Sequence, residues 1–288
     1  MKKLLYILTI ATMIIGCVGC SKEESDKKDD NKKVETQTIE NEFEEDGDVS
    51  DDVSLEDDNV TDETEEADAG TVEFDYMYSD GCVMIKGYKS GDGVAKLEIP
   101  ETIDGMKVCE ISDNAFYGNE VIEELIIPDN VYIGKYAFAL CSNLKNITFG
   151  EGLSLDEFAF MYCSSLESVV LPESITDLPA TVFGGCESLK SVEFMGAIET
   201  IGENAFSGCG FEKITIPDTV KFIGQSAFSC ESLREVHLSS ADIIWEDGWD
   251  PFYDCDNLTI YAPAGSTVEE FVKEMVEVYK YNFKFVAE

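Results

Sequence analysis

The sequence is poor in the groups that most catalytic and metal sites use. It contains one histidine, His237, and one arginine, Arg234, among 288 residues. A single imidazole cannot build a histidine-based metal site, and a single guanidinium leaves almost no bidentate phosphate recognition. A Gly-x-Ser-x-Gly elbow, a P-loop and a dinucleotide fingerprint are also absent. A pair of carboxylates could still act on glycosides, but acidic residues are too abundant for any pair to be informative. We therefore expect no catalytic residue, no metal and no cofactor.

Positive charge is also scarce. The chain has 20 Lys and Arg against 60 Asp and Glu, which gives a formal net charge of −40. Nucleic acid and anionic membrane surfaces require a basic face, so both are poor partners. The first apolar run, Leu4 to Gly16, is too short for a stable membrane-spanning helix, and no later run approaches that length. We expect membrane contact only through a lipid.

The first residues predict a secretory signal peptide, because Met1-Lys2-Lys3 precedes the short apolar run. The stretch from Ile14 to Cys20 resembles the lipobox of bacterial lipoproteins, which implies cleavage before a cysteine and lipid on that cysteine. Cys17 fits the pattern better, because Ile14 and Ile15 precede Gly16, and it predicts a signal peptide of residues 1–16. Cys20, with a signal peptide of 1–19, is the alternative, and an ordinary cleaved signal with incidental cysteines is another.

Residues 17–70 have the composition of a tether. Between Ser21 and Gly70 there are 22 Asp or Glu against five Lys, with no proline and almost no aromatic residue. Such a segment cannot bury enough apolar surface to offset its conformational entropy, so we expect an extended, disordered acidic segment. An alternative is that the charge binds calcium or a basic partner, although no spacing here matches a calcium loop.

From Cys109 to Leu258 one motif recurs every 22 to 24 residues. Each copy begins with an apolar residue, which is usually followed by Gly. Two variable residues and Ala-Phe come next, and Cys and Leu follow, as in the copy from Ile133-Gly134 to Leu144. Seven phenylalanines mark its copies: Phe116, Phe138, Phe160, Phe183, Phe206, Phe228 and Phe252. The period is too short for a pair of helices, but it suits one short strand plus a helical or irregular segment in each turn of a solenoid. We therefore expect seven turns.

The residues after each Cys-Leu step alternate apolar, variable, apolar, as in Val169-Val170-Leu171. This period of two predicts a short strand with one buried face. Prolines follow the strands: Pro100, Pro128, Pro172, Pro217 and Pro263. Stacked turns would make these strands parallel neighbours about 4.8 Å apart, and each Phe would lie over the Phe of the adjoining turn.

The glycine of the motif has a packing role in this interpretation. Gly134, Gly202 and Gly224 are matched by Ser112, Asp156 and Pro179 in other repeats, and proline cannot adopt a positive φ. We therefore expect compact packing, or the entrance to a short helical turn, and no left-handed backbone at this position. Local distortion of the repeat that holds Pro179 is the alternative.

Six of the eight cysteines after Gly70 share one repeat position: Cys141, Cys163, Cys186, Cys209, Cys230 and Cys255. In a secreted chain, an even number of cysteines suggests disulfides. A fixed place in each turn instead favours buried, unpaired thiols that stack as a ladder. Bridges between adjoining turns are the alternative.

The flanks of the repeats predict caps. Residues 71–100 contain two alternating strands, Phe74–Tyr78 and Val83–Tyr88, joined by a turn with Asp-Gly. Ser266 and Glu269 form a capping-box start for a helix up to Tyr279, whose apolar residues are Val268, Phe271, Val272, Met275 and Tyr279. We expect this helix to close the last turn and Asn282 to Val286 to form a final strand. Solenoids need such ends.

The consensus Ile-Pro-x-x-Val-x-x-Ile-Gly-x-x-Ala-Phe-x-x-Cys-x-x-Leu, clearest from Ile216 to Leu233, resembles the BspA-type bacterial leucine-rich repeat. The resemblance covers about residues 94–263. It implies a right-handed leucine-rich-repeat solenoid with parallel strands, and a non-enzymatic bacterial surface protein that in some members is an adhesin for host matrix proteins or other cells. The chain departs from the consensus at Asp156 and Pro179, which replace Gly, and at Val182, which replaces Ala. These departures put only the local geometry in doubt.

Two surfaces are candidates for recognition. The first is the outward strand position, which is occupied by Glu98, Ile126, Thr148, Val170, Glu193, Thr215, His237 and Tyr261. Repeat proteins present such rows as continuous binding surfaces, although strand preference alone also places β-branched and aromatic residues there. The second is the widened last turn with both tryptophans, Trp245 and Trp249. Tryptophan is favoured in binding hot spots, but here it could instead pack beneath the cap.

The sequence thus predicts a signal peptide at 1–16, an acidic tether at 17–70, a β cap at 71–100, leucine-rich repeats at 101–263 and a C-terminal cap at 264–288. We expect a lipid-anchored protein at the outer face of a bacterial cell that binds a protein ligand. Binding of a glycan or a cell-wall component through the Trp245–Trp249 turn is the alternative.

Overall fold

The computed structural model describes residues 72–90, 93–244 and 250–288. Of the two units into which the chain divides, Met1–Thr64 and Glu65–Glu288, every described residue belongs to the second. The predicted signal peptide, Cys17, Cys20 and the acidic tether therefore lie outside the described residues. Within the described ranges, no helix combines the length and the apolar composition needed to cross a bilayer.

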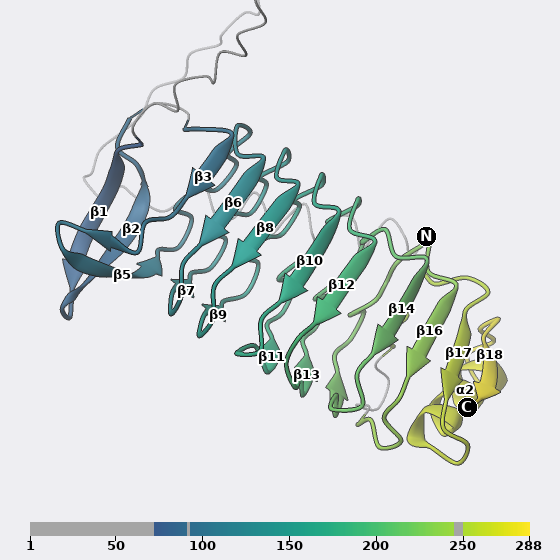
Figure 1. The fold of residues 1–288 in the computed structure, drawn as a ribbon. Coiled ribbons are helices and arrows are strands. Elements are labelled where there is room, and N and C mark those ends of the chain that lie inside the picture. Colours follow the sequence, from purple (N-terminus) through teal and green to yellow (C-terminus); the bar gives the residue numbers. More distant parts are fainter. Residues whose placement is uncertain (1–71, 91–92, 245–249) are drawn as a thin grey trace, which may run out of the picture. The chain divides into compact units, whose positions relative to one another are not determined.

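The second unit is the predicted solenoid, and its main feature is a row of parallel strands (Figure 1). The strands of this row are β3 (Lys96–Glu98), β6 (Glu124–Ile127), β8 (Asn146–Phe149), β10 (Ser168–Leu171), β12 (Ser191–Phe194), β14 (Lys213–Ile216), β16 (Glu235–Leu238), β17 (Thr259–Ala262) and β18 (Lys284–Ala287). The predicted alternation is present, since Val169 and Leu171 of β10 are buried while Ser168 and Val170 are exposed. We call this row the strand row and its solvent side the strand face.

A second row of shorter strands forms another side of the solenoid. It consists of β5 (Met106–Ile111), β7 (Tyr132–Ile133), β9 (Ser154–Leu155), β11 (Asp177–Leu178), β13 (Thr200–Ile201) and β15 (Phe222–Ile223). β5, β7 and β9 pair in parallel in one sheet and β11, β13 and β15 in another, for example Ile133 with Leu155 and Ile201 with Ile223. The sequence did not reveal this row, because two residues before a glycine are too few to show a period of two.

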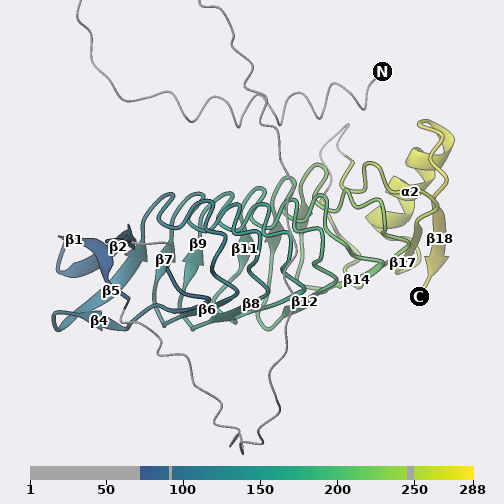
Figure 2. The same ribbon diagram turned by 90° about the horizontal axis from the view of Figure 1, so that it is seen from above.

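The remaining side of each turn is irregular and runs from the Gly to the Cys of the motif (Figure 2). It consists of successive tight turns, as in the hydrogen bonds from Ala137 N to Gly134 O at 3.1 Å and from Ala139 N to Tyr136 O at 3.1 Å. The residue before Ala-Phe is left-handed in six repeats, with φ of 53° to 64°: Asn114, Tyr136, Phe158, Thr181, Asn204 and Ser226. Because side-chain type varies there, sequence alone could not identify this backbone requirement.

The seven motif phenylalanines form one buried column, as predicted. Rings of successive repeats lie 5.1 to 6.1 Å apart between centroids and are within 2° to 21° of parallel. Six of them, from Phe138 to Phe252, have no exposed surface, and Phe116 is 3% exposed. This column is the centre of the core, because every turn contributes one ring to it.

The motif glycines have the predicted packing role. Gly134, Gly202 and Gly224 are not among the glycines with positive φ. A Cβ at Gly134 would lie 2.8 Å from Asp113 N, and one at Gly224 would lie 2.6 Å from Glu203 N. The adjoining turn therefore approaches the glycine too closely for a side chain, and neither a left-handed backbone nor a helix entrance is the reason for it.

The six repeat cysteines form the predicted ladder of free thiols, and all six are buried. Each thiol donates to the carbonyl of the Phe one repeat earlier, at Sγ to O distances of 3.2 to 3.3 Å, as from Cys163 to Phe138. Burial raises the pKa of Cys141, Cys230 and Cys255 to about 12. These thiols are therefore protonated donors at neutral pH and poor nucleophiles.

The N-terminal end has the predicted hairpin of β1 (Phe74–Ser79) and β2 (Cys82–Tyr88), paired antiparallel through a turn with positive φ at Asp80 and Gly81. β2 also pairs in parallel with β5, and β4 (Thr102–Ile103) pairs antiparallel with β5. A disulfide between Cys82 and Cys109 joins β2 to β5. The sequence assigned neither cysteine a partner, because both lie outside the repeated position.

The C-terminal end is closed by α2 (Thr267–Glu277), which is the only helix in the described ranges. Ser266 caps it by accepting from Glu269 N, and Val268, Phe271, Val272 and Met275 are buried. The expectation for Tyr279 was wrong: the helix ends at Glu277, and Tyr279 beyond it is 51% exposed. The expected final strand is present as β18 (Lys284–Ala287), which pairs in parallel with β17.

The estimate of seven turns was too low. The strand row passes nine times, because β17 and β18 extend it beyond the last motif phenylalanine. These two passes lack the Ala-Phe motif, since α2 takes the place of the irregular side after β17. Counting phenylalanines therefore omitted the end of the solenoid.

We predict that Phe160→Ala lowers the free energy of unfolding by about 3 to 5 kcal/mol, because it leaves a cavity in the middle of the Phe column. Chemical denaturation measures this change. Tyr279→Ala is the control, since an exposed aromatic ring should cost less than about 1 kcal/mol. A loss below about 1 kcal/mol for Phe160→Ala would show that the ring does not support the core.

We predict that the chain from residue 21 onward, without reductant, takes up no iodoacetamide while folded and six equivalents once denatured. The six repeat thiols are buried and protonated, and the Cys82–Cys109 disulfide blocks the other two cysteines. Mass spectrometry counts the adducts. Reduction before denaturing alkylation should raise the count to eight, whereas fewer than six adducts without reductant would indicate bridges within the ladder.

Candidate binding surface on the strand row

The structure places the whole predicted outward row on the strand face. Glu98, Ile126 and Thr148 are in register across β3, β6 and β8. Val170 is in register with Glu193, and Thr215 with His237 and Tyr261. The strand face differs along its length, and three sections can be distinguished by their charge.

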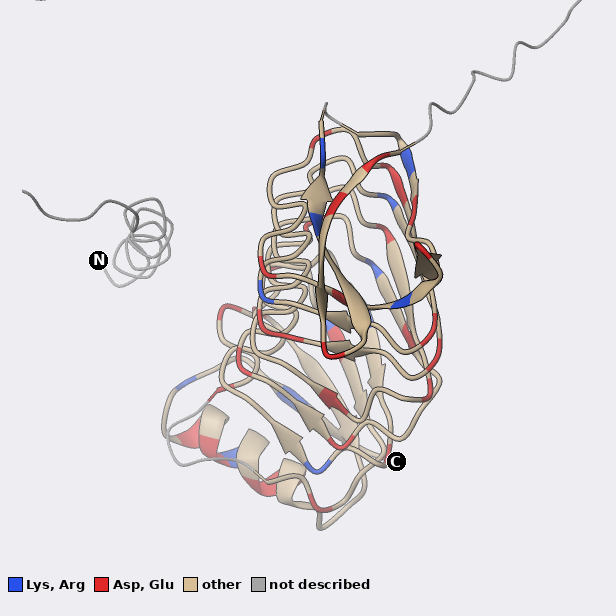
Figure 3. Cartoon of the chain, turned by 90° about the vertical axis from the view of Figure 1, so that its left-hand side faces the viewer, with Lys and Arg blue, Asp and Glu red and all other residues tan. Residues whose placement is uncertain are grey.

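The first section, on β3 and β6, is ionic. Lys96 on β3 lies 4.0 Å from Glu124 on β6, and Lys145 lies 2.6 Å from Glu123 beside the strands. These side chains are about half exposed, so water and salt screen the pairs and each adds little stability. Charges also occupy the turns and α2, as Figure 3 shows from the N-terminal side.

The central section consists of the outward residues of β8, β10 and β12. All six are exposed: Asn146, Thr148, Ser168, Val170, Ser191 and Glu193. Glu193 is the only ionisable residue among them. Val170 is 49% exposed, and Met195, which follows β12, is 52% exposed. The outward side of the central section is therefore nearly uncharged and carries hydroxyl groups and two apolar side chains, while the exposed Glu167 and Lys190 directly precede β10 and β12.

The C-terminal section is organised around His237. Its ring is parallel to that of Tyr261, with 4.3 Å between the centroids. Nε2 lies 2.7 Å from Glu235 Oε1, and Nδ1 lies 3.3 Å from a carboxylate oxygen of Glu288. Glu235 also pairs with Lys213, and these contacts with Lys213 and His237 lower the pKa of the Glu235 carboxyl. His237 points outward as predicted, but its partners hold it and its side chain is only 20% exposed.

Among the described residues, no group of three or more His, Cys, Asp or Glu side chains is arranged to hold a metal ion. The arrangement around His237 joins three strands and the C-terminal residue, which is a structural role.

The second predicted surface cannot be described in the same way, because Trp245 and Trp249 lie outside the described residues. Ile244, which precedes them, forms a parallel bridge with Phe222 and is 61% exposed. The role of the tryptophans stays a prediction.

Sequence reasoning missed an aromatic cluster on the irregular side of the first repeats. Tyr136 and Phe158 are stacked with 4.7 Å between centroids, Tyr117 meets Tyr136 edge-on, and the Lys135 ammonium lies 5.1 Å from the centre of the Phe158 ring. Aromatic residues at the same variable position of two successive repeats were the available signal.

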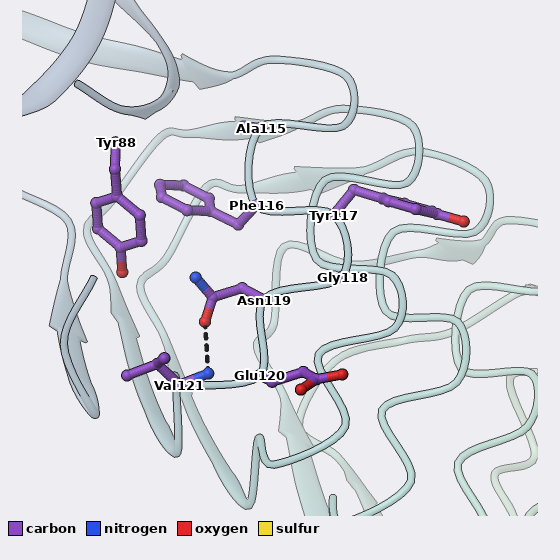
Figure 4. Close-up of a pocket in the computed structure, with 8 residues that line it drawn as sticks. All are labelled: Tyr88, Ala115, Phe116, Tyr117, Gly118, Asn119, Glu120 and Val121. Atoms are coloured by element: carbon purple, nitrogen blue, oxygen red, sulfur yellow. Dashed lines mark hydrogen bonds between the residues drawn. The ribbon is translucent and has the colours of Figure 1, made fainter. Parts of the chain in front are cut away.

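A cavity of about 440 Å³ at the N-terminal end of the solenoid was also missed (Figure 4). It lies between Tyr88 of β2 and residues 115–121 of the first repeat. The sequence carried no signal for it, because a repeat pattern does not show what happens where the pattern begins.

Comparison with the curated proteins finds no match. Among solved structures, a leucine-rich repeat protein of T. pallidum is 24% identical over 75% of this chain and 97% of its own, with a TM-score of 0.47. A leucine-rich cell surface protein from Faecalibacterium prausnitzii is 23% identical over 66% of this chain and 69% of its own, with a TM-score of 0.46.

The family model described as the BspA type leucine rich repeat region matches six copies, over residues 93–155 and 153–275. The match covers more than half of the chain and includes the Phe column, the thiol ladder and both rows of strands except β18. The chain therefore belongs to the BspA-type leucine-rich repeat family.

Proposed function

We propose that this protein is a non-catalytic interaction module at the bacterial cell surface, and that it binds a protein ligand through the central section of the strand face. The observation that carries the proposal is the near absence of charge at six exposed outward positions of β8, β10 and β12, in a chain whose net charge is −40. The family supports an interaction or adhesion role at this coarser level.

The chemistry of the central section suits a protein interface. The centres of such interfaces are depleted in charge and surrounded by a polar rim. Here the ionic section on β3 and β6 lies on one side and the Lys213, Glu235 and His237 cluster lies on the other. Because the stacked strands are rigid, the surface needs little reorganisation on binding.

We propose further that the domain is exported and anchored by lipid at Cys17, with Cys20 as the alternative. The Cys82–Cys109 disulfide supports export, since disulfides persist in oxidising compartments. A tether of about 50 residues could span up to about 170 Å when fully stretched, which would present the solenoid well away from the membrane. A host matrix protein or another cell is the ligand that this placement favours.

We predict that the chain from residue 21 onward, which contains the whole compact unit, binds a component of an array of matrix proteins and glycans. Val170→Arg should weaken that binding at least about tenfold, because it puts a charge in the middle of the uncharged surface. Val278→Arg is the matched control, since Val278 is 63% exposed on the C-terminal cap. Surface plasmon resonance gives the affinities, and circular dichroism checks that both variants fold.

Equal loss in both variants, or full binding by Val170→Arg, would contradict the central section as the binding surface. Selection of a glycan that is lost when Trp245 and Trp249 are both replaced by Ala would instead support the alternative function of the Trp245–Trp249 turn. Retained binding of a matrix protein after the same replacement would count against that alternative.

A further inference from the structure

The irregular side of the solenoid contains three lines of peptide groups that are hydrogen-bonded from one repeat to the next. In the middle line, Phe116 N donates to Ala137 O at 2.8 Å, Phe138 N to Ala159 O at 2.8 Å and Phe160 N to Val182 O at 2.9 Å. The same step continues to the bond from Phe228 N to Pro251 O at 2.8 Å. Asn114 N to Lys135 O and Gly118 N to Ala139 O begin the two flanking lines.

All of these peptide groups point the same way along the solenoid. Each N–H is directed toward the C-terminal end and each carbonyl toward the N-terminal end, since every donor lies one repeat before its acceptor. Aligned peptide dipoles of about 3.5 D add up, as they do in an α-helix, where the carbonyl end carries a partial charge of about −0.5. The N-terminal end of the irregular side is therefore the negative pole of three such lines.

The first repeat has no earlier repeat to supply donors to this pole. By register, the acceptors that correspond to Lys135 O, Ala137 O and Ala139 O are Asp113 O, Ala115 O and Tyr117 O. Within the described ranges, no hydrogen bond reaches any of these three carbonyls. The hairpin covers part of this end, because a Cβ at Gly87 would lie 2.6 Å from Ala115 O.

The positive pole, at the C-terminal end of the irregular side, has a carboxylate as its hydrogen-bond partner. Phe252 N, at the end of the middle line, donates to the Asp250 carboxylate at 2.9 Å. A carboxylate at the N–H end of aligned peptides is the arrangement that also caps helix N-termini. Phe271 of α2 then packs near Phe252, with 6.4 Å between the ring centroids. The positive pole is thus neutralised and covered, so a second copy could not stack onto it end to end.

Two residues of the negative pole, Ala115 and Tyr117, line the cavity between Tyr88 and residues 115–121. Its walls are held in place: Tyr88 meets Phe116 edge-on at 5.1 Å, and Asn119 Oδ1 accepts from Val121 N and Ile122 N at 2.9 Å each (Figure 4). Glu120 is exposed at the rim, and the lining contains no Lys or Arg. A fixed cavity beside the Tyr117 carbonyl, which accepts no hydrogen bond within the described ranges, and the Glu120 carboxylate is suited to a group that has only donors.

We propose that this cavity is a second recognition site, which accepts the ammonium or guanidinium group of a Lys or Arg side chain on a protein ligand. Such a group carries a full positive charge and several N–H donors without an acceptor, so it complements carbonyls that have no other donor. The site is independent of the strand face, and either site could fail without affecting the other.

The test uses the chain from residue 21 onward and two small probes in NMR titrations. N-acetyl-lysine methylamide should shift the amide signals of residues 115–121, whereas N-acetyl-norleucine methylamide, which lacks the ammonium group, should leave them unchanged at the same concentration. Glu120→Gln should weaken the binding of the lysine probe about threefold, because it removes the rim carboxylate.

Glu187→Gln is the matched control. Glu187 is exposed and lies four residues after its motif Phe, as Glu120 does, but in its repeat the preceding repeat supplies the donors, as from Phe160 N to Val182 O. It should leave the affinity unchanged. The proposal is overturned if the norleucine probe shifts the same signals, if the lysine probe shifts acidic residues along the whole solenoid equally, or if the two variants behave alike.

Discussion

The structure depends on one constraint: no turn of this chain can satisfy its own backbone or bury its own ring. Each Phe side chain needs the rings before and after it, and alternate peptide N–H groups on the irregular side need an acceptor one repeat away. Even the thiols donate across turns, to the Phe carbonyl of the preceding repeat. Stability is therefore a property of the contacts between turns, which is why both ends require caps.

The sequence predicted the interior well, because an interior shared by stacked turns restricts the same positions in every repeat. Phe160 and Cys163 could be assigned to a column and a ladder on this basis, and Gly134 to close packing. The left-handed backbone at Tyr136 and Phe158 escaped detection, since the constraint there acts on the main chain while the side chain remains free. The Cys82–Cys109 disulfide and the full number of turns escaped because they depend on segments where the repeat stops.

The candidate sites follow the same division. Alternation along the strands placed Val170 and His237 on the outward side, but it could not show that one is open and the other is held by Glu235 and Tyr261. That difference arises from neighbours on other strands and from the C-terminal residue. The charge at the end of the irregular side is even less visible in the sequence, because it comes from the main chain.

The repeat of Phe228 is one residue shorter than the others before its cysteine, and the missing residue is the one that corresponds to Gly208, where φ is 73°. Its step to the following turn therefore has two main-chain bonds on the irregular side, from Ser226 N and Phe228 N, where the earlier steps have three. The same step has continuous pairing on the strand row, because β16 pairs with β17 from Glu235 to His237. Because the absent bond lies on the irregular side, local opening of this step would begin there while the strand row stays paired.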